Sequence, residues 1–254
     1  MASNRKHVNV GRFFQEEPFK SKRTGRGSSV PVHNRNSHGA GLQGQYQAVL
    51  NQYEHIETNR PAPITEDIGI YVEILSEAGC KLPLDSLDNR DFKLRAHKLQ
   101  GDREVATVFI PESRRAAFLK KIRQYLDPSK DGKPTKDGEV FPKNHTLLDS
   151  ISEIKLANLK SFWTDPDEFY PEDLDAKFWW EIWLKETSNR NANEIAVQLS
   201  ERLNATLSNS SLTFFNTVVF LIHCSANDLK KAPDLIGNLE ELRKAKETPN
   251  PIVE

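Results

Sequence analysis

Two serines and one histidine have the residue types that a hydrolase would need. Ser28 and Ser29 lie in a Gly-Ser-Ser-Val-Pro run, and His38 precedes a glycine. A serine nucleophile requires a rigid turn, a base within hydrogen-bonding distance and an acid that orients the base. The serines fall in a segment without the pattern of a regular element, and His38 falls at the start of a predicted helix, where capping is a natural role. We therefore predict no catalytic residue and no enzymatic activity for this chain alone. A hydrolase that depends on His38 is the alternative.

Carboxylates and histidines are the side chains that could bind a metal. The carboxylates gather in one run: Asp165, Asp167, Glu168, Glu172, Asp173 and Asp175. A metal site needs ligands that converge, so the simpler interpretation is a solvated loop that caps the following element. His97 and His223 lie in predicted strands, where core or edge positions are expected. The G-x-x-x-x-G-K-[ST], G-x-G-x-x-G, C-x-x-C and H-E-x-x-H motifs are absent. We predict no metal and no cofactor.

The net charge is divided unevenly along the chain. Residues 1–37 contain eight Lys or Arg and two Glu, which gives this basic arm a charge of +6 and leaves −7 for the remaining residues. Lys20, Lys22, Arg23 and Arg26 stand among glycines and serines, as in segments that contact phosphate backbones. The alternative, which the charge division favours, is an arm that binds the protein's own acidic body or an acidic partner.

Composition limits the class of protein. The 254 residues have a mean hydropathy of −0.62, no run of 18 apolar residues and no apolar segment near the start. We therefore predict neither a membrane span nor a secretory signal. Cys80 and Cys224 each lie in an apolar segment and are predicted to be buried thiols of a reduced, cytoplasmic protein.

Hydrophobic periodicity predicts two α+β halves. An amphipathic helix is expected from residue 38, and strands over Ile68–Leu75, Phe92–Leu99 and Glu104–Ile110, the last two as a hairpin before a second helix. In the second half we predict strands over Phe178–Leu184 and Thr213–Cys224, a helix over Asn193–Leu203 and a closing helix over Asp228–Ala245. Tyr71–Leu75 and Trp179–Leu184 share an aromatic-x-Glu-Ile pattern, which suggests two sandwich-like β-α-β-β-α subdomains.

These elements predict a division of the chain. It comprises the basic arm at 1–37, an amphipathic helix and linker at 38–63, a first α+β subdomain at 64–143 with a mobile loop at 127–143, a second at 144–247, and a linker at 248–254.

Adjacent tryptophans on a strand point to opposite faces. Trp179, Trp180 and Trp183 belong to one predicted strand, so either Trp179 or Trp180 is expected to be exposed and to anchor an interface. With Lys20, Lys22, Arg23 and Arg26, these tryptophans are the candidate interface residues.

Several motifs carry a resemblance to a known family. They are Arg35–Ala40 (RNSHGA), Ala106–Glu112 (ATVFIPE), Phe118–Ile122, Asp149–Ile154, Phe162–Asp165 (FWTD), Trp179–Leu184 (WWEIWL) and Glu241–Arg243. In this order the chain resembles the amino-terminal region of bacterial subtilisin-like (S8 family) serine proteases that are encoded beside an AAA-type ATPase. Such pairs are similar to plasmid-incompatibility and anti-phage defence systems.

The resemblance implies a function without implying catalysis by this chain. The family's Asp, His and Ser motifs lie downstream of the matching region, and no Asp-[Ser/Thr]-Gly, His-Gly-Thr-His or Gly-Thr-Ser-x-Ala occurs here. The expected function is a regulatory and docking module, similar in architecture to subtilase propeptides. Its expected partners are its own catalytic domain and the ATPase. The alternative is a nucleic-acid-sensing module that binds through the basic arm.

Overall fold

The computed structural model of the protein describes residues 31, 33–59, 62–65, 68–127, 133–134, 140–186 and 191–246. The four basic candidates, Lys20, Lys22, Arg23 and Arg26, and the two serines, Ser28 and Ser29, lie outside the described residues.

The first half consists of α1 (Arg35–Asn59), β1 (Gly69–Ser76), η2 (Leu84–Ser86), β2 (Lys93–Gln100), β3 (Arg103–Pro111), η3 (Glu112–Arg114), α2 (Arg115–Leu126), β4 (Lys133–Pro134), β5 (Val140–Phe141), α4 (His145–Leu148) and β6 (Ile151–Leu156). The second half consists of η4 (Leu159–Phe162), η5 (Asp167–Phe169), β7 (Lys177–Lys185), α5 (Ala192–Leu203), β8 (Thr206–Thr213), β9 (Thr217–Ser225), α6 (Ala226–Leu229), α7 (Ala232–Leu235) and β10 (Leu239–Lys244).

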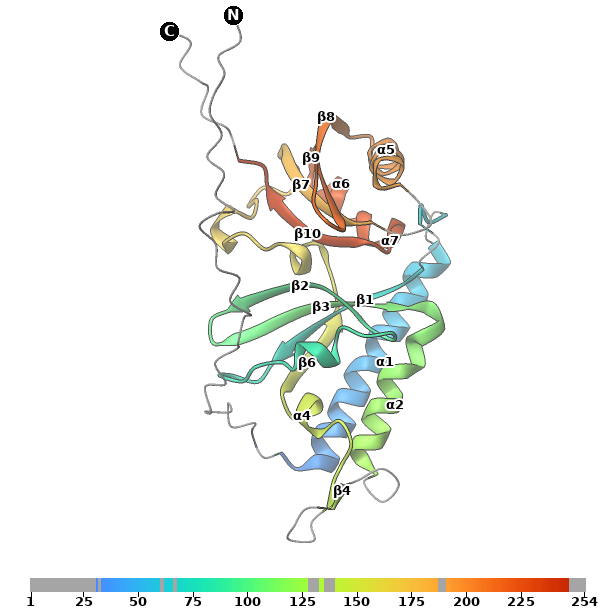
Figure 1. The fold of residues 1–254 in the computed structure, drawn as a ribbon, viewed down its shortest axis with the longest axis vertical. Coiled ribbons are helices and arrows are strands. Elements are labelled where there is room, and N and C mark those ends of the chain that lie inside the picture. Colours follow the sequence, from blue (N-terminus) through green and yellow to red (C-terminus); the bar gives the residue numbers. More distant parts are fainter. Residues whose placement is uncertain are drawn as a thin grey trace, which may run out of the picture.

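The first half is built on an antiparallel sheet in the order β2-β3-β1-β6. Because β1 and β2 are both antiparallel to β3, they run parallel to each other, and the segment between them crosses over the sheet. Alternation along β1 turns Ile70, Val72 and Ile74 to one face, where they share a core with Tyr46 of α1 and Phe118 of α2. Figure 1 shows α1 and α2 side by side on this side of the sheet.

The second half repeats this topology. Its sheet has the order β10-β7-β9-β8, with all neighbours antiparallel, so β7, β8, β9 and β10 take the places of β1, β2, β3 and β6. The chain order β7-α5-β8-β9-α6-α7-β10 is that of the ferredoxin-like split βαβ fold. In the first half, the segment with η2 replaces the helix between the first two strands. Many unrelated functions use this fold, so it does not by itself assign one.

The second half covers the face of the first sheet that carries no helix, and Figure 1 shows it on the side opposite α1 and α2. Tyr71 and Phe109 are register partners at this contact and belong to one core with residues of the second half. The Tyr71 hydroxyl donates to the Ile236 carbonyl oxygen at 3.0 Å and accepts from the Leu239 amide at 3.2 Å. The two halves are therefore joined through a continuous core and through polar contacts to the turn before β10.

The predicted α+β class is confirmed, with one four-stranded antiparallel sheet in each half. The hairpin of β2 and β3 and the strands β1 and β7 are also confirmed, with each bound shifted by one residue. Within the predicted loop at 127–143, the short strands β4 and β5 pair with each other. None of the helices in the described part of the chain combines the length and hydrophobicity that a bilayer crossing requires.

The predicted closing helix over Asp228–Ala245 is wrong. Its first part forms the single-turn helices α6 and α7, and its second part is the strand β10. The register of β10 shifts between Leu239 and Glu241, so Leu239 and Leu242 both reach the core although they are three residues apart. A bulge in a strand thus produced the spacing of a helix.

The predicted boundary of the basic arm is also wrong by three residues. Helix α1 begins at Arg35 because Asn34 caps it: the Asn34 carbonyl oxygen accepts from the His38 amide at 2.9 Å, and its side-chain oxygen accepts from the Ser37 amide at 3.2 Å. The capping role expected for His38 therefore belongs to Asn34.

Removing the Tyr71 hydroxyl tests the contact between the halves. Tyr71→Phe leaves the buried Leu239 amide and Ile236 carbonyl without this partner, so we expect the free energy of unfolding to fall by about 1–3 kcal/mol. Tyr170→Phe is the matched control, since the half-buried Tyr170 hydroxyl bonds to none of the described residues. Urea unfolding of both variants measures the difference, and equal stability would argue against this role of Tyr71.

Thiol reactivity tests the predicted burial of the cysteines. Neither cysteine forms a disulfide and both are buried, and burial raises the pKa of Cys224 to about 12 and that of Cys80 above its usual value. Because the thiolate is the reactive form, we expect Ellman's reagent at pH 8 to label neither cysteine quickly in the folded protein and both in urea. Rapid labelling of either one without denaturant would contradict the structure.

Candidate interaction surface

One face of the second sheet lies opposite its helices. Alternation along β7 turns Trp180 into the core, where it is 0% exposed and its indole N–H donates to the Cys224 carbonyl oxygen at 3.1 Å. The same alternation turns Trp179, which is 39% exposed, to the other face. We call this other face the open face. It comprises Trp179, Glu181 and Trp183 of β7 and their register partners His223, Leu221 and Val219 of β9.

Trp183 is held between two neighbours on the open face. Its ring stacks on Phe214 with centroids 5.5 Å apart and an interplanar angle of 5°, and the Arg243 guanidinium lies 4.5 Å from its centroid. The Trp183 indole N–H is inaccessible to solvent and has no hydrogen-bond acceptor among the described residues. An unpaired buried donor costs about 1–3 kcal/mol.

Trp179 and Glu181 are the parts of the open face with unused binding capacity. The Trp179 ring lies 5.1 Å from the His223 ring and keeps much of its surface exposed. Glu181 is half-buried and makes no hydrogen bond or ion pair with another described residue. Its register partner Arg243 is instead bound to Glu241 at 2.6 Å. The centre of the open face therefore presents a carboxylate with no cation of its own.

The equivalent face of the first sheet shows what a covered surface looks like. Tyr71 and Glu73 of β1 occupy the places that Trp179 and Glu181 occupy in β7. Glu73 is buried and forms an ion pair with Lys155 of β6 at 2.9 Å. This hydrogen bond raises the pKa of Lys155. The covered copy of the face thus has its carboxylate neutralised, whereas the open copy does not.

Exposed apolar residues extend the open face at the turn between β8 and β9. Leu212 is 66% exposed, Phe214 is 51% exposed and Phe215 is fully exposed. Leu212 is the register partner of Val219, so it lies on the same face as Trp183. Large apolar side chains grouped in this way are typical of protein-binding sites.

An acidic segment runs toward the other end of the open face. Residues 165–175, which we call the acidic strip, contain six carboxylates and no Lys or Arg. The strip follows the edge of the second sheet, since the Asp165 carboxylate accepts from the Lys244 amide of β10 at 2.9 Å. It ends shortly before Trp179, and Phe169 and Leu174 are exposed along it. The predicted solvated loop is therefore a surface that is both acidic and apolar.

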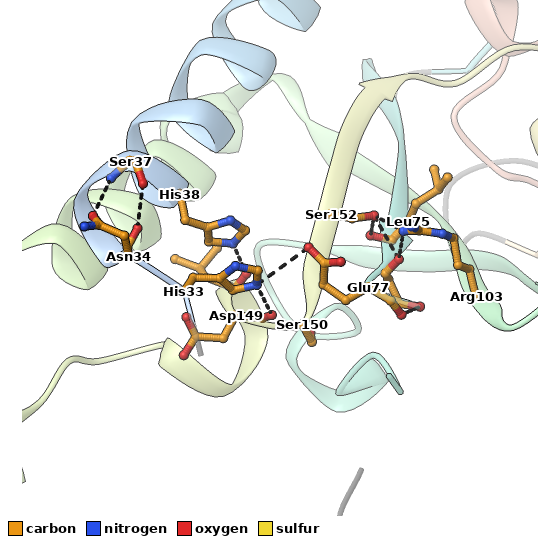
Figure 2. A network of polar contacts seen from close by, with 12 residues as sticks. His33, Asn34, Ser37, His38, Leu75, Glu77, Arg103, Asp149, Ser150 and Ser152 are labelled. Atoms are coloured by element: carbon orange, nitrogen blue, oxygen red, sulfur yellow. Dashed lines mark hydrogen bonds and ion pairs between the residues drawn. The ribbon is translucent and has the colours of Figure 1, made fainter. Parts of the chain in front are cut away.

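The histidines at the start of α1 form a separate cluster (Figure 2). The His33 and His38 rings stack with centroids 3.9 Å apart and an interplanar angle of 2°. His38 Nε2 lies 2.9 Å from the Leu148 carbonyl oxygen, and His33 Nε2 lies 3.2 Å from that of Asp149. Because a carbonyl only accepts, both imidazoles donate to the turn between α4 and β6. This cluster anchors the start of α1.

The cluster lacks the geometry of a hydrolytic site. A cavity of about 300 Å³ lies beside the two imidazoles, but the Ser37 hydroxyl donates to the Asn34 carbonyl oxygen rather than to a histidine. Asp149 accepts a hydrogen bond from the Tyr125 hydroxyl, and burial together with this carboxylate raises the pKa of Tyr125. Within the described residues, no group of three or more His, Cys, Asp or Glu side chains is placed to hold a metal.

The structure thus gathers the predicted tryptophans on one strand but separates their roles. Trp180 belongs to the core, Trp183 is half-buried, and Trp179 is the exposed candidate. Sequence reasoning missed Glu181 and Phe215. The repeated aromatic-x-Glu-Ile pattern could have indicated Glu181, whereas Phe215 was placed within a predicted strand and lies in the turn before β9.

Comparison with known proteins does not assign this chain to a family. No protein-family model matches it, and no curated protein matches it.

The two equivalent glutamates give a test of the difference between the faces. Glu73→Gln weakens the ion pair with Lys155, and because Lys155 is partly solvated we expect a loss of about 1 kcal/mol in stability. Glu181→Gln removes a charge that has no partner, so its effect should stay within about 0.5 kcal/mol. Urea unfolding measures both, and a larger loss for Glu181→Gln would refute our description of the open face.

Proposed function

We propose that this chain is a non-catalytic docking module that binds a protein partner through the open face. The observation that carries the proposal is the difference between two copies of one surface. The face with Tyr71 is covered by the second half. In the part of the chain that the structure describes, its counterpart keeps Trp179 exposed, Glu181 unpaired and the Trp183 N–H without an acceptor. An exposed tryptophan is typical of residues that dominate binding energy.

The covered copy suggests the kind of contact that the partner makes. On the first sheet, Tyr71 exchanges hydrogen bonds with backbone groups of the turn before β10, and the same turn's Gly237 carbonyl accepts from Arg95 at 2.9 Å. A polypeptide turn that offers carbonyl oxygens and an apolar side chain would suit the open face equally well.

Two partners follow from the motifs that resemble subtilisin-like proteases. The WWEIWL motif is the strand β7, so the most specific part of that resemblance coincides with the open face. We therefore propose the catalytic domain of such a protease and its AAA-type ATPase as partners, in cytoplasmic anti-phage defence. In this role the chain would hold the protease inactive, in the manner of a propeptide, or couple it to the ATPase.

A nucleic acid is the partner from another class. A sheet of this topology with an exposed aromatic ring can stack bases, and the basic arm could contact phosphates. The carboxylate of Glu181 and the neighbouring acidic strip oppose a phosphate backbone, so the surface favours protein. A salt titration separates the two, because binding through phosphate contacts weakens steeply as the salt concentration rises.

Substitution on the open face tests the proposal. We expect Trp179→Ser to weaken binding to the catalytic domain or to the ATPase at least tenfold, since a buried anchor contributes about 2 kcal/mol or more. Phe141→Ser is the matched control, because Phe141 is 47% exposed and lies in the first half. Isothermal titration with each purified partner measures the affinities.

Three results would count against the proposal. They are no binding to either partner, equal affinities for the two variants, and salt-dependent binding of an oligonucleotide that Trp179→Ser abolishes while protein binding is unaffected. These experiments measure docking directly, so they need no peptidase assay.

A further inference from the structure

The acidic strip reaches the edge of the open face at β10. The Asp165 carboxylate binds the Lys244 amide, and the next residue, Ala245, donates its amide to the Trp179 carbonyl oxygen at 2.9 Å. At its other end the strip is fixed by the Asn227 amide, which donates to the Leu174 carbonyl oxygen at 3.0 Å. Between these ends the Tyr170 ring packs on Trp163 and Trp180, so a ligand on the strip reaches the open face by crossing the β10 edge at Asp165.

Little of the strip's charge is neutralised by the described residues. Asp167 forms an ion pair with Lys160 at 3.3 Å, and Asp175 accepts from the Asn227 side chain at 2.7 Å. Glu168 and Glu172 are exposed and make no hydrogen bond or ion pair with another described residue. Together with Glu181, they leave negative charge on this surface that a basic segment could neutralise.

The chain carries such a segment in its basic arm. His33, bound to the Asp149 carbonyl, marks the place where the basic arm joins the fold. From there β6 covers about 20 Å on the way to the strip. An extended chain spans roughly 45 Å between Lys20 and His33, more than twice the length of β6.

We propose that the basic arm docks on this surface in cis, with Lys20 and Lys22 against the acidic strip. The preceding residues Phe13 and Phe14 then cover the apolar part of the open face. The arm thereby competes with the partner for the open face, a consequence that rests on the proposed function. Residues 1–34, which precede α1, carry a charge of +5 and the strip carries −6, so this segment of the chain is the matching occupant.

Each ion pair between the arm and the strip is expected to be weak. Their covalent connection within one chain favours the contact. Exposed ion pairs contribute about 0.2–1 kcal/mol each, and salt screens them. A short tether gives an effective concentration in the millimolar range, so even a weak contact is populated within one chain. The arm should therefore be docked at low ionic strength and released by salt or by a competing partner.

Zero-length cross-linking tests the contact in the full chain. A carbodiimide that joins amines to carboxylates should link Lys20 or Lys22 to residues 165–175, and mass spectrometry identifies the linked peptides. In a mixture of ¹⁴N- and ¹⁵N-labelled protein, we expect these links within single isotopes and a loss of at least fivefold in 0.5 M NaCl. Links from the two lysines to other regions only, or links that mix isotopes, would overturn docking in cis.

Charge reversal gives an independent measurement by acrylamide quenching of tryptophan fluorescence. Trp179 is the exposed tryptophan, so its quenching should rise when the arm is released. The arm variant is K20E/K22E/R23E/R26E, and the charge-matched control on exposed positions of the first half is K81E/R90E/K120E/R123E. We expect stronger quenching in the arm variant alone and no rise when Trp179→Phe is added. Equal quenching in the two variants would overturn the proposal.

The same variants separate this inference from the proposed function. If cross-links form but Trp179→Ser leaves partner affinity unchanged, docking of the arm stands and the proposed function fails. If Trp179→Ser weakens partner binding but no cross-links form, the proposed function stands and docking of the arm fails. If both stand, the arm variant should bind the partner several-fold more tightly than the unmodified chain.

Discussion

The fold depends on how an antiparallel sheet with helices on one side protects its other side. In this chain the same four-stranded arrangement occurs twice, and each copy places an aromatic residue and a glutamate of its first strand on the face without helices. The first copy is protected by the second, through Tyr71, Phe109 and the turn before β10. Without this contact, a large aromatic surface and the hydrogen-bonding groups of that turn would face water.

The helix-free face of the second sheet is subject to the same need for a cover. Nothing within the described residues covers the open face in the way that the second half covers the first sheet. The difference is chemical as well as geometric, because Glu73 pairs with Lys155 while Glu181 pairs with no cation among the described residues. The acidic strip adds negative charge at the edge of this face, and the compensating positive charge of the chain lies in its basic arm. Docking and its regulation would thus act on a single surface.

Much of the fold could be predicted from the sequence because alternation and turns are local signals. The hairpin of β2 and β3 and the strand β7 follow from such signals. β10 could not be predicted in this way, because a bulge gave Leu239 and Leu242 the spacing of a helix. The start of α1 was missed because a cap depends on a single side chain, Asn34.

The candidate site was only partly predictable. Alternation implied that either Trp179 or Trp180 is exposed, but only packing decides which one faces the helices. The special position of Glu181 depends on Arg243 being bound elsewhere, which is a tertiary contact between side chains that the sequence does not encode locally. The turn position of Phe215 ends an apolar run that looked like one continuous strand.

The central claim is that the open face, rather than α1, α2 or the histidine cluster, is where a protein partner binds. Hydrogen exchange with mass spectrometry, on the full chain with and without an excess of the protease catalytic domain or the ATPase, tests it most directly. The account predicts new protection in peptides covering β7 and the turn between β8 and β9, and none in α1 or α2. Protection confined to α1, α2 or the turn between α4 and β6, or no protection with either partner, would contradict it.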